Sequence, residues 1–175
     1  MYEKLIDNLL TTYDFENKRY AIICVGIPGC GKSTFCKELK NSLTLNVISK
    51  DAVRFLFMNY DSSNTAFDIN IEEFVALFIQ KQVEWLITNT PFNFFSDECN
   101  ETAAKRILWE TMFADKNIEI IYVVFDDFEL YRKYMNERRR QVPEAIVAEF
   151  RRKFTHPNKK YISAKNFVRK MYEWK

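Results

Sequence analysis

The stretch RYAIICVGIPGCGKST, from Arg19 to Thr34, decides the fold of this chain. Its first part, Arg19–Val25, is a near-continuous apolar run, which is typical of a strand buried on both faces. The next eight residues, Gly26–Ser33, match the pattern GxxxxGK[ST], and helical spacing follows from Lys32 onward. All three glycines of the chain lie within Gly26–Gly31, so backbone freedom is concentrated in this one loop. We therefore predict a buried strand, a phosphate-binding loop and a helix in succession.

Each residue type in the loop has a physical task. Glycines let the backbone curl so that consecutive N–H groups point at phosphate oxygens, and the positive end of the following helix adds to that field. We expect Lys32 to reach the β- and γ-phosphates of ATP (or another nucleoside triphosphate), and the Ser33 hydroxyl to ligate Mg²⁺. The residues of the loop that we predict to bind the nucleotide are Gly26, Gly29, Cys30, Gly31, Lys32, Ser33 and Thr34.

The rest of the chain alternates short apolar runs with segments of helical periodicity. This alternation predicts an α/β fold with a P-loop NTPase-type core: a mostly parallel sheet of about four to five strands, flanked by helices. We expect residues 1–175 to form one domain. The predicted strands are 19–25, 45–49, 92–96 and 118–125, and the predicted helices are 3–12, 32–43, 51–58, 71–87, 102–113, 128–138, 143–154 and about 163–174.

Composition limits the classes of protein that fit. The hydrophobic fraction is 47% and the aromatic fraction 16%, which excludes a disordered chain. No apolar run approaches a membrane span, and the N-terminus lacks the basic start of a signal peptide, so we expect a cytoplasmic protein. The four cysteines have no metal-binding spacing. Residues 1–125 hold 12 Lys/Arg against 17 Asp/Glu, whereas residues 126–175 hold 14 against 7. The C-terminal third therefore either faces an anionic ligand or carries ordinary solvated charge.

A second group of polar residues follows the predicted strand 45–49. In a doubly wound sheet the strand carboxyl ends line one crevice, so Asp51 should emerge beside the phosphate loop. A carboxylate there can accept a proton from an incoming hydroxyl, and Arg54, one helical turn on, can hold an anionic group of the acceptor. The alternative role for Asp51 is a helix N-cap.

An arginine-rich turn, Asn136–Pro143, lies between two predicted helices. Kinases of this architecture use cations that close over the donor and offset the charge that spreads across the transferred phosphoryl group. We therefore interpret residues of about 136–154 as a lid. The alternative is a solvated helix end, where arginine also favours the negative terminus.

These three motifs together resemble the 5′-hydroxyl polynucleotide kinases, over about residues 20–155. The resemblance rests on GxPGxGKST, on a strand that ends in Lys50-Asp51-x-x-Arg54, and on Asn136-x-x-Arg139 running into Val-Pro. It implies that Asp51 is the general base, that Arg54 grips the terminal phosphate of the acceptor, and that Arg139 is the lid arginine that contacts the nucleotide. The family often has another arginine where this chain has Met135; Arg138 or Arg140 is the candidate replacement.

The family's third strand ends in an Asp-x-Asn segment. Asp97 is the equivalent that the resemblance implies, and it would orient a Mg²⁺ water or an arginine; the alternative is a helix-start aspartate. The asparagine counterpart is either Asn100 or absent, with Cys99 in register. We assign the single histidine, His156, to a surface turn, and Asp126-Asp127 to helix capping.

The sequence thus predicts an ATP-dependent kinase in which Lys32, Asp51, Arg54 and Arg139 act in catalysis and Ser33 and Asp97 bind the metal. The resemblance implies a 5′-hydroxyl end of RNA or DNA as acceptor, with a ligase or phosphatase as a separate partner. Two alternatives stay open. One is a small-molecule kinase acting on a sugar, nucleotide or antibiotic, and the other is an NTP-binding regulatory or toxin-like module.

Overall fold

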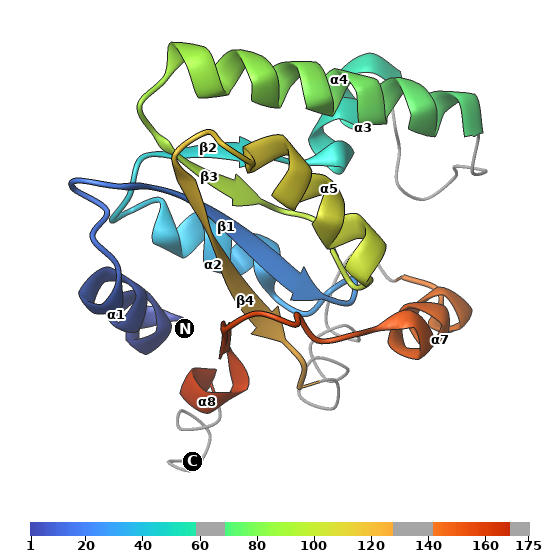
Figure 1. The fold of residues 1–175 in the computed structure, drawn as a ribbon. Helices are drawn as coiled ribbons and strands as arrows, with labels where there is room; N and C mark the ends of the chain where they lie inside the picture. The colour runs from blue at the N-terminus through green and yellow to red at the C-terminus, as the bar shows by residue number, and fades with distance from the viewer. Residues whose placement is uncertain (59–68, 128–141, 169–175) are drawn as a thin grey trace.

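The computed structural model describes residues 1–58, 69–127 and 142–168. Figure 1 shows a twisted sheet between two layers of helices. The strands are β1 (Arg19–Gly26), β2 (Leu45–Ile48), β3 (Asn93–Ser96), β4 (Ile118–Phe125) and β5 (Tyr161–Ser163). The helices are α1 (Glu3–Thr12), α2 (Lys32–Leu39), α3 (Lys50–Met58), α4 (Ile69–Asn89), α5 (Ala103–Phe113), α7 (Glu144–Lys153) and α8 (Lys165–Val168).

The sheet has the strand order β2-β3-β1-β4-β5, and all neighbouring strands are parallel. The central strand β1 pairs with β4 along its whole length, from Arg19 opposite Ile118 to Gly26 opposite Phe125. Because every strand runs the same way, the carboxyl ends of β1, β2, β3 and β4 lie at one edge of the sheet. This edge is where ligands bind in open parallel sheets.

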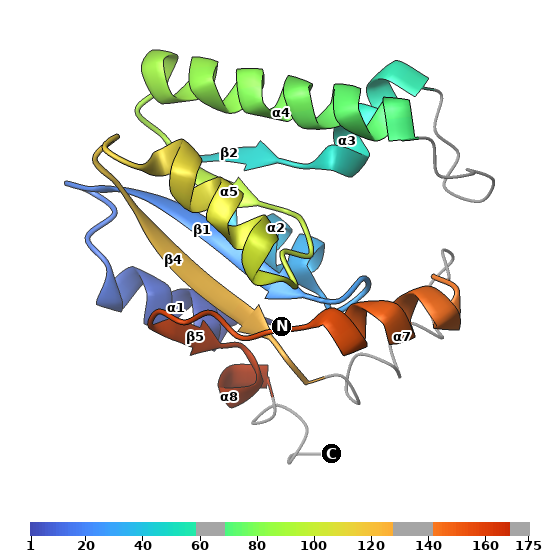
Figure 2. The same ribbon diagram turned by 45° about the vertical axis from the view of Figure 1, so that its right-hand side comes forward.

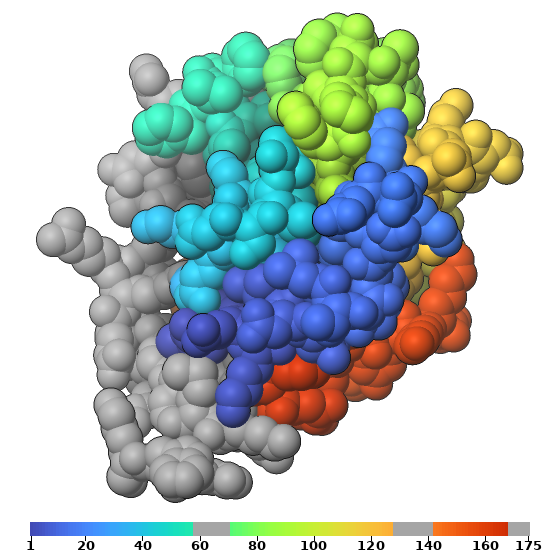
Figure 3. Space-filling model, turned by 90° about the vertical axis from the view of Figure 1, so that its left-hand side faces the viewer, coloured from blue at the N-terminus to red at the C-terminus, as the bar shows by residue number. Residues whose placement is uncertain are grey.

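Two hydrophobic cores hold the helices to the sheet. Alternate residues of β1 point to opposite faces: Ile22 and Cys24 pack with α1 and α2, whereas Ile23 and Val25 pack with α4 and α5. Burial on both faces explains the near-continuous apolar run of this strand. Figure 2 shows the two helical layers on either side of the sheet, and Figure 3 shows α1 packed against the C-terminal segment around α8.

The α/β fold with a parallel sheet is confirmed, with strands and helices close to their predicted bounds. Helix α2 ends at Leu39 rather than at residue 43, and β5 lies where the sequence showed no strand. The predicted helix 128–138 lies outside the described residues, and so does the part of the predicted helix 163–174 that follows α8. Among the helices that the structure describes, none is long and apolar enough to cross a membrane.

Candidate functional site

The phosphate loop joins the end of β1 to the start of α2, as the sequence predicts. Gly29 and Gly31 have φ angles of 80° and 98°, in the left-handed region that favours glycine. Gly31 is also the N-cap of α2, and it has no side chain that could occupy the first N–H groups of the helix. The curled loop therefore leads directly into the start of a helix that has no side-chain cap, and this combination is typical of an anion site.

Gly26 is needed for a different reason. It ends β1 with its backbone packed against β4, and its N–H donates to the Cys99 carbonyl at 2.8 Å. A Cβ atom placed on Gly26 would lie 2.5 Å from Cys30 Sγ and 2.9 Å from Phe125 Cβ. The first glycine of the motif thus allows close packing under the loop, whereas Gly29 and Gly31 supply its curvature.

Lys32 is buried inside the loop, with 6% of its surface exposed. Its Nζ donates to the Ile27 carbonyl at 2.8 Å and to the Gly26 carbonyl at 3.2 Å. The same nitrogen lies 3.5 Å from Cys30 Sγ and 3.6 Å from Cys99 Sγ. In this structure Lys32 Nζ therefore contacts carbonyl and sulfur atoms of the loop and the sulfur atom of Cys99. Of the two candidates for the family's asparagine position, Asn100 and Cys99, it is Cys99 that contacts Lys32.

Burial affects the ionisation of the groups around this lysine. It disfavours the charge of Lys32, but the negative charge of Cys30, Cys99 and Cys24 in their ionised forms and of Asp97 outweighs that effect, so the pKa of Lys32 lies above its ordinary value. Burial raises the pKa of Cys30 and brings that of Cys99 to about 11. Both thiols are therefore protonated at neutral pH and are weak nucleophiles.

Ser33 and Asp97 come together across the loop, as the predicted metal site requires. The Ser33 hydroxyl donates to Asp97 Oδ1 at 3.0 Å, which joins the start of α2 to the end of β3. A hydroxyl and a carboxylate oxygen are donors that Mg²⁺ accepts, and this ion usually takes one or two protein carboxylates together with waters and phosphate oxygens. The donor set therefore fits Mg²⁺ in association with a bound nucleotide.

Asp51 lies in the first turn of α3 and is not its cap. The cap is Ser49, whose Oγ accepts from the Ala52 N–H at 3.3 Å and whose carbonyl accepts from the Val53 N–H at 3.2 Å. The side chain of Asp51 is 58% exposed, and its Oδ1 accepts from Arg54 Nη1 at 2.7 Å. Its carboxylate is thus accessible from solvent at the same sheet edge as the phosphate loop.

Arg54 is held by a residue that the sequence analysis did not single out. Its Nε and Nη2 donate to the two carboxylate oxygens of Glu72 on α4, at 2.8 and 2.6 Å. Burial alone would lower the pKa of Arg54, but Glu72 and Asp51 more than compensate and raise it. Glu72 lies 18 residues away on another helix, so no local sequence signal marked the pair.

The end of β3 contributes two neighbouring carboxylates that serve different helices. Asp97 contacts Ser33 as described, whereas Glu98 Oε1 accepts from the Lys50 N–H at 3.3 Å and Glu98 Oε2 lies 3.9 Å from Lys50 Nζ. Burial raises the pKa of Glu98, and Lys50 partly offsets that effect. Sequence reasoning missed Glu98 because it considered only the aspartate and asparagine positions of the segment.

Asn100 has a structural role here. It is buried, and its amide donates to the Cys24 carbonyl at 2.8 Å and to Ser96 Oγ at 3.0 Å, while its Oδ1 accepts from Trp109 Nε1 at 2.8 Å. With its φ of 47°, it turns the chain from β3 toward α5. The side-chain amide of Asn100 is therefore bonded to groups of the core.

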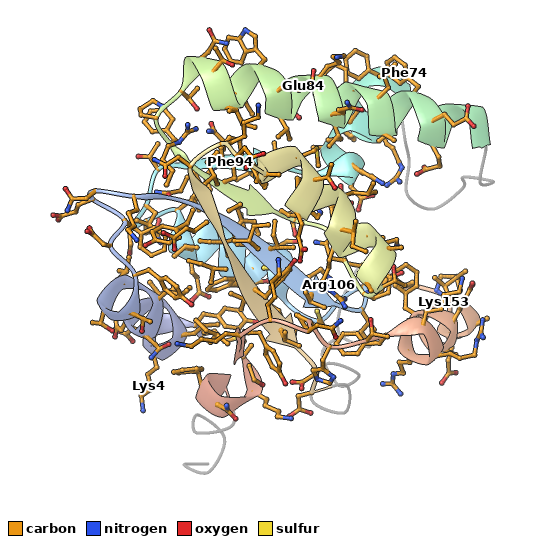
Figure 4. The ribbon with its side chains drawn as sticks, in the orientation of Figure 1. Lys4, Phe74, Glu84, Phe94, Arg106 and Lys153 are labelled. Carbon is orange, nitrogen blue, oxygen red and sulfur yellow. The ribbon has the colours of Figure 1, made fainter. Side chains whose placement is uncertain are left out.

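Arg106 joins α5 to the segment that follows α7. Arg106 is buried and donates to the carbonyls of Asn100, Thr155 and His156 at 2.9 to 3.1 Å. Figure 4 labels Arg106 between α5 and this segment. His156 is exposed at the surface, as expected, and its Nε2 lies 3.0 Å from Asp126 Oδ2.

Asp126, beyond the end of β4, accepts from three side chains, and the helix that Asp126-Asp127 is predicted to cap lies outside the described residues. Besides His156, Ser163 Oγ and Lys165 Nζ each lie 3.2 Å from its oxygens. Burial would raise its pKa, but these hydrogen bonds outweigh that effect and lower the pKa of Asp126. The group ties β4 to β5 and α8.

Asn136 and the lid arginines, Arg138, Arg139 and Arg140, lie outside the described residues, as does Met135. Of the predicted lid, the structure describes Pro143 and α7, which begins at Glu144 directly after the proline. Arg151, Arg152 and Lys153 form the last turn of α7, where positive charge favours the helix terminus.

An all-parallel sheet, a glycine loop between β1 and α2, and Lys32 with Ser33 and Asp97 at the carboxyl edge together define a P-loop kinase fold. A family model described as an AAA domain matches residues 22–157. This match spans most of the chain, from the phosphate loop through α7, and the protein belongs to that family.

Solved structures with a similar fold come from several kinds of protein. A chain of the Pnkp1/Rnl/Hen1 RNA repair complex has a TM-score of 0.62 and 20% identity, over 81% of this chain and 45% of that chain. A gluconokinase from Sinorhizobium meliloti 1021 has a TM-score of 0.56 and 12% identity, over 87% and 90%. Kti12 of Chaetomium thermophilum, in complex with ADP-AlF3, has a TM-score of 0.56 and 14% identity, over 87% and 97%. At these identities the likeness establishes the fold. The chain spans less than half of the RNA repair chain.

Proposed function

We propose that this protein is an ATP-dependent kinase that transfers the γ-phosphoryl group to the 5′-hydroxyl end of RNA or DNA. The observation that carries the proposal is the position of Asp51: an exposed carboxylate in the first turn of α3, at the same sheet edge as the loop Gly26–Ser33. A protein that only hydrolyses or senses a nucleotide needs no carboxylate to accept a proton from an acceptor hydroxyl. Here Asp51 is such a carboxylate, and Arg54 beside it donates to it. The similarity to a chain of an RNA repair complex supports the polynucleotide acceptor.

The proposed reaction is a direct displacement at phosphorus. The acceptor hydroxyl oxygen forms a bond to the γ-phosphorus, the bond from that phosphorus to the β–γ bridging oxygen breaks, and ADP leaves. Asp51 accepts the proton of the hydroxyl. Lys32 and the N–H groups of the loop stabilise the charge on the phosphate oxygens, and Ser33 and Asp97 would hold Mg²⁺, which would neutralise phosphate charge.

Arg54 would hold the terminal phosphate of the acceptor. A guanidinium has five N–H donors, and the bonds to Asp51 and Glu72 use one donor on each nitrogen. Among the residues that the structure describes, no other acceptor bonds the second N–H of either terminal nitrogen, which could therefore bind an anion. Glu72 thus fixes the plane of the guanidinium while leaving it able to bind a phosphate oxygen.

The lid is part of this proposal. Arg139 would close over the nucleotide and offset charge on the transferred group, with Arg138 or Arg140 in support. A ligase or phosphatase would act as a separate partner on the same nucleic acid end.

A second candidate function is a small-molecule kinase. The similarity to the gluconokinase favours it, because that likeness covers 90% of the gluconokinase chain as well as 87% of this one. The two candidates share the loop and Asp51 and differ only in the acceptor. An NTP-binding regulatory module is the third candidate, and it requires no acceptor.

Radiolabelled ATP separates the three candidates. The protein is incubated with 5′-hydroxyl oligonucleotides of RNA and DNA, and in parallel with a panel of sugars, nucleosides and aminoglycosides. We expect label on the oligonucleotides. Label on a metabolite and never on an oligonucleotide would establish the small-molecule kinase, and release of phosphate without a labelled acceptor would support the regulatory module.

The general-base role of Asp51 is tested by Asp51→Asn, which keeps the shape of the side chain and removes its basicity. We expect transfer to fall by about 10²- to 10⁴-fold, the range for a general base, with ATP affinity unchanged. Near-normal turnover in this variant would refute the assignment.

A further inference from the structure

The two carboxylates at the end of β3 face the two halves of the candidate site. Asp97 accepts from Ser33 at the start of α2, on the donor side, and the next residue, Glu98, accepts from the Lys50 N–H at the start of α3, on the acceptor side. Both residues follow the last residue of β3, and the chain bends at Glu98, so two neighbouring side chains reach different helices. The end of β3 thus connects the nucleotide loop with the helix that carries Asp51.

Several bonds fix the first turn of α3. Ser49 caps the Ala52 N–H, Glu98 accepts from the Lys50 N–H, and the Asp97 N–H donates to the Ile48 carbonyl at 2.9 Å. The side chain of Glu98 is only 15% exposed, and it lies between the backbone and the ammonium of Lys50. A carboxylate at a helix N-terminus also interacts favourably with the helix dipole. Glu98 therefore acts as a second cap of α3, supplied from a different strand.

We infer that Glu98 is a positioning residue that sets Asp51 at the correct distance from the phosphate loop. The inference rests on the proposed function, because it assigns a role to the helix that presents the general base. Asp51 is mostly exposed, and the start of its helix is fixed through Ser49 and Glu98. Without Glu98 the first turn of α3 frays, and the carboxylate of Asp51 spends less time in the reactive position.

Two substitutions at Glu98 separate positioning from simple stability. Glu98→Ala removes the acceptor, and we expect kcat to fall about tenfold, as for the loss of one charged hydrogen bond, with the KM for ATP unchanged. Glu98→Gln keeps an acceptor oxygen for the Lys50 N–H and should restore most of kcat. A wild-type kcat in the alanine variant would overturn the inference, and so would a glutamine variant as slow as the alanine variant.

Glu101→Ala is the matched control. Glu101 lies in the same segment and is more deeply buried than Glu98, with 4% of its side chain exposed against 15%. Its carboxylate pairs with Lys105 on α5 and, among the residues that the structure describes, makes no hydrogen bond to α3. We expect this variant to lose stability and to keep its kcat. An equal loss of kcat in both alanine variants would show a general packing effect and overturn the positioning role.

A second measurement does not depend on any acceptor. Amide hydrogen exchange at Lys50 and Ala52 reports directly on the first turn of α3. We expect faster exchange at both amides in Glu98→Ala and unchanged exchange in Glu101→Ala. If Asp51→Asn abolishes transfer while Glu98→Ala changes neither exchange nor kcat, the positioning role fails and the proposed function stands. If no acceptor is phosphorylated, the proposed function fails. In that case, unchanged exchange of the Lys50 amide in Glu98→Ala would also show that Glu98 does not protect this N–H.

Discussion

Arg54 on α3 and Glu72 on α4 face each other through two parallel hydrogen bonds, Nε to Oε1 at 2.8 Å and Nη2 to Oε2 at 2.6 Å. Both side chains are more than three-quarters buried, and the pair lies where α3 packs against α4. A bidentate pair of this kind fixes the guanidinium plane as well as its position. The orientation of Arg54 is thus set by a residue of α4.

The first prediction follows from this pair. Glu72→Gln removes the charge and one of the two acceptor oxygens, so Arg54 loses its fixed plane. We expect kcat/KM for the acceptor to fall about tenfold, on the scale of one charged hydrogen bond, with ATP affinity unchanged. Glu73→Gln, at the exposed neighbouring position of α4, is the control. Equal acceptor kinetics in the two variants would contradict the role of Glu72.

The second prediction concerns packing under the phosphate loop. In Gly26→Ala the new methyl group would lie 2.5 Å from Cys30 Sγ and 2.9 Å from Phe125 Cβ. We expect the free energy of unfolding to fall by about 1–3 kcal/mol, the usual cost of overpacking. Urea denaturation measures this loss. The double variant Gly26→Ala with Cys30→Ala should recover part of it, because only the contact with Phe125 remains. No recovery would show that β4 alone limits this position.

The third prediction tests the metal site. Ser33→Ala removes one of the two oxygen groups that fit Mg²⁺, and Asp97→Asn replaces the other, a carboxylate, by a neutral amide, so we expect the Mg²⁺ concentration for half-maximal phosphoryl transfer to rise in both. The shift should be larger for Asp97→Asn, because the negative charge that attracts the ion is lost. Ser42→Ala, at an exposed position beyond the end of α2, should behave as wild type. A normal Mg²⁺ dependence in Asp97→Asn would remove this residue from the metal site.

The fourth prediction concerns acid stability. Hydrogen bonds from His156, Lys165 and Ser163 lower the pKa of Asp126 in the folded protein despite burial. A lowered folded-state pKa gives stability that is fully present above the ordinary aspartate value of about 3.9 and is lost as the pH falls through the folded-state pKa. We expect wild type to be more stable than Asp126→Asn above about pH 5, with the difference shrinking on acidification. A difference independent of pH, measured by denaturation between pH 3 and 7, would contradict this account.

The sequence by itself determined the strand, loop and helix from Arg19 to Leu39 and the class of fold. The reason is local: a doubly buried strand needs an apolar run, a phosphate loop needs glycine, and both signals lie in consecutive residues. The contact between Ser33 and Asp97 could also be predicted from the sequence, because parallel strands bring their carboxyl ends to one edge of the sheet.

Only the tertiary structure decided which residues support the site. Glu72 reaches Arg54 from α4, and the turn beyond β3 supplies both Glu98, which caps α3, and Cys99, which contacts Lys32. These pairs join segments that lie 18 to 67 residues apart, and a charged or thiol side chain carries no periodic signal of its partner. The short strand β5 was missed for the same reason. Its three residues pair with β4 at the edge of the sheet, and that pairing rather than local sequence makes it a strand.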